Sequence, residues 1–135
     1  MHASDLMTPN PVVVRPHDTL HYALQLMNEK RIRHLPVLDA HGALVGLVTD
    51  RDLRRLTPSP LSPGGYEAAM TVMNETLVEK AMVREPLTVQ SDTPLKEVVA
   101  MFVAKKYGAV PVVQGKSLVG IISQIDCLRV LLKAL

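Results

Sequence analysis

Two short segments place a hydroxyl residue three positions before an aspartate, each directly after an apolar run. They are Thr49 with Asp52 and Ser123 with Asp126. A hydroxyl at a helix N-cap with an acid at N3 is typical of a capping box. The same geometry can serve a ligand, because a helix N-terminus offers unpaired N–H groups and partial positive charge to an anion. A nearby carboxylate can accept both hydroxyls of a ribose, so the spacing fits either a helix cap or a nucleoside phosphate site.

Both segments belong to an internal repeat that covers most of the chain. The matched pairs are Met7 with Met82, Pro11 with Pro86, Leu20 with Leu95, Pro36 with Pro111 and, after the loss of one residue, Gly46 with Gly120. Two copies are too few for a stacked solenoid. We therefore predict two similar units related by pseudo-twofold symmetry in one compact module, which at this length buries roughly 65–70% of the surface of the unfolded chain.

The hydrophobic period changes in the same order in both copies. It predicts short extended segments at 12–14 and 87–89, amphipathic helices from Leu20 and Leu95, strands at 35–38 and 110–113, hairpin turns at 41–42 and 115–116, returning strands at 44–48 and 118–122, and helices that open at 49–50 and 123–124. Each copy is thus predicted to be β-α-β-β-α. The fold class is α/β in the broad sense (α+β), with tandem repeats.

A segment rich in proline and glycine separates the copies. Residues 57–65 contain three prolines and two glycines, which predicts a surface loop. Residues 66–74 are predicted to be helical, and a short helix is predicted near 77–81. The predicted organisation is a first repeat at 1–56, a loop and linker helix at 57–75, and a second repeat at 76–135.

Composition narrows the class of protein. The apolar residues are mostly aliphatic, with one Phe, three Tyr and no Trp, and the net charge of +2 is too small to indicate a nucleic-acid partner. The single cysteine excludes an intrachain disulfide and fits a reducing compartment. The sequence has no signal-peptide pattern and no apolar run of about 18 residues. We expect a soluble, cytoplasmic protein with no membrane contact.

The order P-x-x-V, helix, φ-P-V, turn, L-V-G-φ-φ-[ST]-x-x-D, present twice, resembles the cystathionine-β-synthase (CBS) domain pair, or Bateman module. The resemblance covers nearly the whole chain except the proline loop and residues 66–74. It implies two clefts between the repeats that bind adenine nucleotides. In that family the Asp holds the ribose hydroxyls, the Ser/Thr contacts phosphate, and the base packs against the other repeat. It also implies a regulatory role as a sensor, and a homodimer formed through the helices.

Carried over by residue, the resemblance assigns two nucleotide clefts. The first would combine Thr49, Arg51 and Asp52 with Leu87, Thr88, Val89, Tyr107, Gly108, Ala109 and Pro111. The second would combine Ser123 and Asp126 with Val12, Val13, Val14, Ile32, Arg33, His34 and Pro36. Tyr107 could stack on adenine, and Arg51 could meet the phosphates. Ile125 occupies the position of Arg51 in the second copy, so phosphate binding there would fall to Arg33 and His34, and we expect unequal affinities.

Structural interpretations of the same residues remain open. Tyr107 could be a half-buried cap on the core, and the run 30–34 could be a solvated helix end favoured by the helix dipole. Asp50 could neutralise its neighbour Arg51. Cys127 is predicted to be a packed thiol.

Other functions have weaker support in the sequence. Asp50 with Asp52, or His17 with His21, could begin a metal site, but no third ligand is placed by spacing. No catalytic constellation can be assembled, so we predict no enzyme activity, no metal site and no obligatory cofactor. The predicted ligand is an adenosine-containing small molecule, with or without Mg²⁺, and the regulated target is another, unknown protein. The main alternative is a ligand-free scaffold that dimerises or binds a partner.

Overall fold

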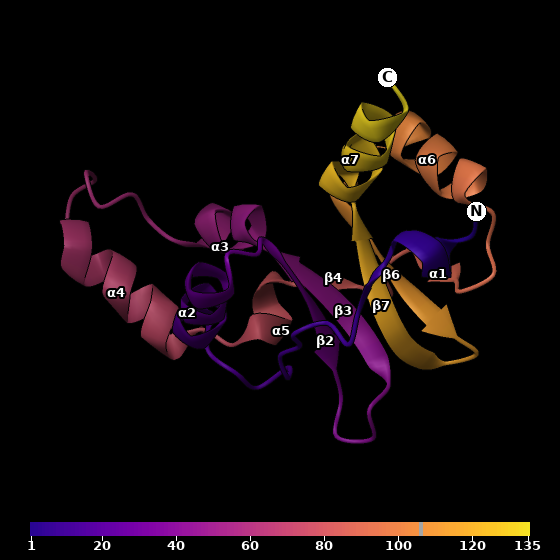
Figure 1. Ribbon diagram of the computed structural model, residues 1–135. Helices are drawn as coiled ribbons and strands as arrows, with labels where there is room; N and C mark the ends of the chain where they lie inside the picture. Colours follow the sequence, from indigo (N-terminus) through magenta and orange to yellow (C-terminus); the bar gives the residue numbers. More distant parts are fainter. Residues whose placement is uncertain (106) are drawn as a thin grey trace. The chain divides into compact units, whose positions relative to one another are not determined.

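The computed structural model describes residues 1–105 and 107–135, and the chain divides into two compact units (Figure 1). The central unit is Val12–Glu85. The terminal unit combines Met1–Pro11 with Pro86–Leu135. Each unit has a small sheet, flanking helices and its own apolar core.

The central unit is built on a three-stranded antiparallel sheet in the order β2-β3-β4. Its elements are α2 (Leu20–Lys30), β2 (His34–Leu38), β3 (Leu44–Thr49), α3 (Asp50–Leu56), α4 (Gly65–Glu75), α5 (Val78–Ala81) and β4 (Val83–Arg84). At the β2 edge, Val14 adds a single parallel bridge to Val37.

The terminal unit has a four-stranded sheet in the order β1-β7-β6-β5. Its elements are α1 (Ala3–Leu6), β1 (Thr8–Pro9), β5 (Val89–Gln90), α6 (Leu95–Ala104), β6 (Ala109–Gln114), β7 (Ser117–Ser123) and α7 (Gln124–Ala134). β5 pairs with β6 in parallel, and the other two pairings are antiparallel. This is the same arrangement as in the central unit, with a regular strand where that unit has only the Val14 bridge.

The predicted β-α-β-β-α order is confirmed in both copies, with the predicted first strand of the first copy reduced to one bridge. The predicted helices at 66–74 and 77–81 are present as α4 and α5. Three elements were not predicted, namely α1, β1 and β4. Each is too short to give a hydrophobic period.

The units do not follow the boundaries of the sequence repeat. β1 lies near the start of the first copy yet pairs with β7 of the second, and β4 lies near the start of the second copy yet pairs with β3 of the first. The copies thus exchange their first segments. Neither unit is therefore made from a single copy of the repeat.

A close approach at one glycine in each unit accommodates the exchanged segment. A Cβ added at Gly46 would fall on the side chain of Met82 and lie 3.1 Å from the carbonyl oxygen of Val83. A Cβ at Gly120 would meet the side chain of Met7 in the same way. Because Met7 and Met82 are matched residues of the repeat, the two contacts are equivalent.

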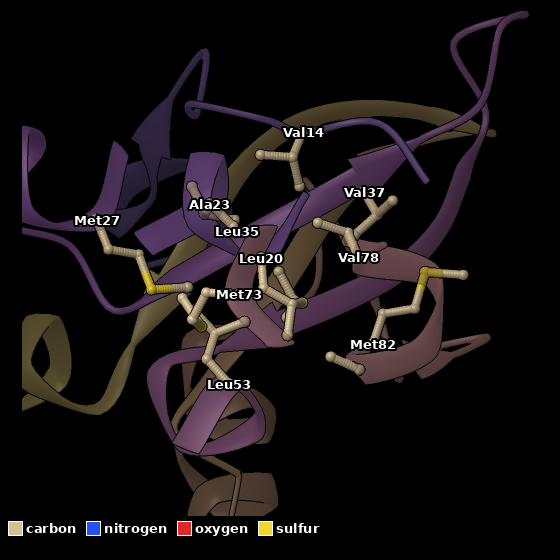
Figure 2. Packing of buried hydrophobic residues seen from close by; sticks show 12 residues of the cluster. Val14, Leu20, Ala23, Met27, Leu35, Val37, Leu53, Met73, Val78 and Met82 are labelled. Carbon is tan, nitrogen blue, oxygen red and sulfur yellow. The ribbon is translucent and has the colours of Figure 1, made fainter. Parts of the chain in front are cut away.

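In the core of the central unit, the apolar face of α2 packs against the sheet and α4. Leu20, Ala23 and Met27 recur at helical spacing on α2 and are buried. They join Val37 of β2 and Met73 of α4, among other residues (Figure 2). In the terminal unit the smaller core is built from β5, β6, β7 and α6, and Cys127 packs against it half-buried, as predicted.

We expect Gly46→Ala to lower the free energy of unfolding by about 1–3 kcal/mol, because the new methyl group overpacks a filled contact. In a Met82→Ala background the same substitution should be less costly, since the clashing side chain is gone. Urea unfolding of the four proteins of this cycle measures the coupling. If Gly46→Ala lowered the free energy of unfolding equally in both backgrounds, the absence of a side chain at Gly46 would not be required by the packing of Met82.

Candidate functional site

The predicted capping box at the start of α3 is complete. The backbone N–H of Thr49 donates to Oδ2 of Asp52 over 2.9 Å, and the Asp52 N–H donates to Oγ1 of Thr49 over 3.2 Å. The Thr49 hydroxyl also donates to the same Oδ2, at 3.0 Å. The Asp52 side chain is only 8% exposed. The box therefore fixes the carboxylate and uses one of its two oxygens.

The start of α7 repeats this geometry. The Ser123 N–H donates to Oδ2 of Asp126 over 2.8 Å, and the Asp126 N–H donates to Oγ of Ser123 over 3.2 Å. The Asp126 side chain is 17% exposed. This carboxylate is thus held in the same way but is more accessible to solvent.

An arginine one turn further along each helix faces the second carboxylate oxygen. Nη2 of Arg55 lies 3.3 Å from Oδ1 of Asp52, and Nη1 of Arg129 lies 3.8 Å from Oδ1 of Asp126. Neither arginine was predicted to be a site residue. The repeated spacing D-x-x-R, which follows the hydroxyl residue in both copies, could have indicated them.

In the central unit the box lies next to Arg33 and His34. His34 of β2 pairs with Thr49 of β3, and the Asp50 N–H donates to the Arg33 carbonyl oxygen over 3.1 Å. Burial lowers the pKa of His34 below its ordinary value of 6.5, the charge of Asp50 opposes this shift, and Arg33 adds to it. The imidazole is therefore held toward its neutral form.

The terminal unit places Tyr107, Gly108 and Ala109 beside its own box. Ala109 of β6 pairs with Ser123 of β7, and the Gln124 N–H donates to the Gly108 carbonyl oxygen over 3.1 Å. The Gln124 side-chain amide donates to the Tyr107 carbonyl oxygen over 2.6 Å. Tyr107 is 40% exposed.

The other predicted cleft residues lie on the strands, on the extended segments that precede α2 and α6, and, for Ile32, between α2 and β2. Pro36, Pro111, Val14 and Val89 are buried, whereas Val12, Val13, Ile32 and Thr88 are partly buried and Leu87 is exposed. Each predicted cleft draws its box from one unit and its remaining residues from the other. Their combination into clefts stays a prediction.

Arg51 is exposed on the first turn of α3. Its backbone N–H donates to Oδ1 of Asp50 over 2.9 Å, while the Asp50 carboxylate pairs with Arg54 at 3.5 Å. Within the part of the chain that the structure describes, no ion pair involves Arg51. The charge of Asp50 is thus directed to Arg54 rather than to Arg51.

His17 lies 4.0 Å from a carboxylate oxygen of Glu79. Over residues 1–105 and 107–135, no group of three or more His, Cys, Asp or Glu side chains is arranged to hold a metal ion. In the same residues no helix has the length and apolar character needed to cross a bilayer.

Comparison with known proteins gives consistent matches. A family model described as CBS domain matches residues 3–58 and 78–133. A CBS domain-containing protein of Dictyostelium discoideum is 33% identical over 131 residues, covering 96% of this chain and 90% of that protein. Chloroplastic CBSX1 of Arabidopsis thaliana is 32% identical over 139 residues, covering 90% of this chain but 59% of that protein, less than two thirds of its length.

Solved structures of CBSX2 from Arabidopsis thaliana have the same fold. One has a TM-score of 0.84 at 30% identity and covers 98% of this chain and 95% of that chain. A crystal structure of CBSX2 in complex with AMP has a TM-score of 0.80 at 30% identity, over 98% and 97% of the two chains.

The lowered pKa of His34 predicts a loss of stability in mild acid. Below pH 6.5 the unfolded chain takes up a proton at this position that the folded chain resists, so the free energy of unfolding should fall as pH drops through that value. Urea unfolding between pH 7.5 and 5.5 measures the slope. The slope should be shallower in His34→Gln, and an identical slope would show that His34 is not responsible.

Proposed function

The chain belongs to the CBS domain family, and on that basis we propose that it is a regulatory module that binds an adenine nucleotide and has no catalytic activity of its own. The observation that carries the proposal is the pair of capping boxes, each of which holds a carboxylate and leaves one of its oxygens outside the box. The AMP complex of CBSX2, 30% identical to this chain, supports the choice of ligand.

The second oxygen of each carboxylate, outside the box, is suited to a ribose hydroxyl. Its present partner is an arginine whose side chain is 64% exposed at Arg55 and 72% exposed at Arg129, whereas the side chains of Asp52 and Asp126 are only 8% and 17% exposed. A fully exposed ion pair contributes about 0–1 kcal/mol. These pairs are partly buried, so a ribose must replace the arginine as a partner. A hydroxyl that donates to a charged acceptor contributes about 1.5–3 kcal/mol, which offsets the loss of the arginine.

The two boxes would serve two unequal clefts. We assign Thr49, Arg51 and Asp52 to the first, with Tyr107 stacked on the base. We assign Ser123 and Asp126 to the second, with the residues of 12–14, 32–34 and Pro36. In the second cleft Arg33 and His34 replace Arg51 at the phosphates. The neutral tendency of His34 weakens its contribution there, so the first cleft should bind a nucleotide phosphate more tightly.

The regulatory output would pass to another protein. Nucleotide binding changes the geometry of the module, and a target protein, not yet identified, responds to that change. Mg²⁺ can accompany a polyphosphate ligand without protein ligands of its own. The single cysteine fits action in a reducing compartment such as the cytoplasm.

A second candidate function is a dimerisation scaffold that needs no ligand. Helix α7 buries no residue, and its apolar side chains Ile125, Leu128, Leu131 and Leu132 are all more than half exposed. Exposed apolar surface of this extent is typical of an interaction site. We propose that α7 supplies part of a homodimer interface, whether or not a nucleotide is bound.

AMP titrated into the full chain should give saturable heat by calorimetry and, at about 100 times its Kd, stabilise the fold by about 2.7 kcal/mol. Asp52→Asn and Asp126→Asn keep an oxygen for the box but remove the negative charge and one acceptor. Each should weaken one cleft about tenfold or more, and the double variant should lose saturable binding. Asp92→Asn, an exposed carboxylate outside both boxes, is the matched control.

A double variant that is folded and binds AMP as tightly as the wild type would overturn the ribose assignment. A wild-type chain that binds none of AMP, ADP and ATP would favour the ligand-free scaffold. Two sites with identical affinity would contradict the unequal clefts.

Leu128→Lys should shift the chain from dimer to monomer in light scattering after size exclusion, because it places a charge in the proposed α7 interface. Leu61→Lys makes the same change in the proline-rich loop, where the side chain is 97% exposed, and should leave the dimer intact. A wild-type chain that is monomeric at high concentration, or a Leu128→Lys chain that stays dimeric, would contradict the α7 interface.

A further inference from the structure

A half-open cavity of about 640 Å³ lies in the central unit, between the end of α2, helix α3 and helix α4. Cavities of about 300–1,000 Å³ are the usual size of small-molecule sites. One wall is made by Tyr66, Ala69, Met70 and Met73 of α4. This helix belongs to the segment between the repeats, outside both stretches that match the family model. The α4 wall is therefore not part of the duplicated scaffold, whereas the walls from α2 and α3 are.

The floor of the cavity is apolar and well packed. Met27, Leu53, Ala69 and Met73 line it and are each less than a tenth exposed. Figure 2 shows Met27, Leu53 and Met73 together in this part of the core. Thioether side chains are polarisable and adapt to the shape of a flat or branched ligand. The floor thus suits a hydrocarbon body rather than a sugar.

The rim is basic. Arg31, Arg33 and Arg54 line the cavity together with one acid, Asp50. Asp50 is paired with Arg54 at 3.5 Å. Among the residues that the structure describes, Arg31 and Arg33 hold no ion pair. An anion at the rim would therefore meet two guanidinium groups, while the carboxylate of Asp50 is engaged by Arg54. Charge-assisted hydrogen bonds of this kind are stronger than neutral ones.

We propose that this cavity binds a small amphipathic anion, with an aromatic or branched hydrocarbon body on the methionine floor and one carboxylate, sulfonate or phosphate group at Arg31 and Arg33. The site is separate from the capping boxes. It shares Ile32 and Arg33 with the proposed second cleft, but none of Thr49, Asp52, Ser123 and Asp126 lines it. Its one carboxylate, Asp50, also lies outside the capping boxes that fix Asp52 and Asp126.

The test uses the full chain and 1-anilinonaphthalene-8-sulfonate, an aromatic anion whose fluorescence rises in an apolar site. We expect saturable binding with one site per chain. N-phenyl-1-naphthylamine has the same body without the sulfonate and should bind about tenfold more weakly. Arg31→Gln should weaken the sulfonate by a similar factor and leave the neutral analogue unchanged.

Two further variants locate the site. Met70→Trp fills the cavity from α4 and should abolish dye binding in a chain that remains folded by circular dichroism. Leu128→Lys alters the exposed face of α7, the other apolar surface that could take the dye, and should leave binding unchanged. Because Arg33 is shared with the proposed second cleft, the neutral analogue is used for the competition with AMP. Saturating AMP should not displace the neutral analogue, and the dye result stands even if AMP fails to bind.

Three outcomes would overturn the proposal. They are equal affinity for the neutral analogue, full dye binding by folded Met70→Trp, and loss of binding in Leu128→Lys. Displacement of the neutral analogue by AMP would instead place a nucleotide in the cavity. A Met70→Trp chain that loses dimerisation while it keeps the dye would assign the cavity to a second copy of the chain.

Discussion

The fold depends on a missing side chain at Gly46 and Gly120. Only a residue without Cβ lets the side chains of Met82 and Met7 lie against the middle of β3 and β7. Those contacts seat β4 and β1, which complete the two sheets. Since each methionine lies near the start of one copy of the repeat and packs on the glycine of the other, the same constraint also joins the copies. The strand that contains each glycine ends at a capping box, so the close approach and the candidate site lie on the same strand.

The capping boxes explain how one pair of residues can serve both structure and ligand. The box uses Oδ2 of each aspartate and a hydroxyl lone pair, and it satisfies backbone N–H groups that would otherwise lack a partner. The second oxygen is held only by an exposed arginine. The structural interpretation and the ligand interpretation of Asp52 and Asp126 therefore do not compete. The two boxes are not identical, because Asp126 is more exposed than Asp52 and its arginine is more distant.

Because the sequence is duplicated, most of the fold could be predicted from it. Helix α2 follows from Leu20, Ala23 and Met27, and the boxes follow from the spacing of Thr49 to Asp52 and Ser123 to Asp126. The sequence also shows that Met7 matches Met82. Similarity between two segments does not, however, show which of them pairs with which strand. β1 and β4 are two residues long, so no periodicity could reveal the exchange. Arg55 and Arg129 were visible as a repeated spacing, but their role depends on a distance to the carboxylate that sequence cannot supply.

The two copies depart from symmetry in the packing of the helices that follow the boxes. At matched positions Leu53 of α3 is buried whereas Cys127 of α7 is half-buried. The difference arises because α4, part of the segment between the copies, contributes Met73 to the cluster around Leu53. The cover is incomplete and leaves a cavity with a basic rim, whereas the apolar side chains of α7 stay exposed. The two copies thus share the chemistry of their boxes and differ in how the following helices, α3 and α7, are covered. A ligand that fills the cavity would contact α3 through Leu53 and Arg54, within one turn of Asp52, so its binding can be coupled to the first box without a shared residue of that box.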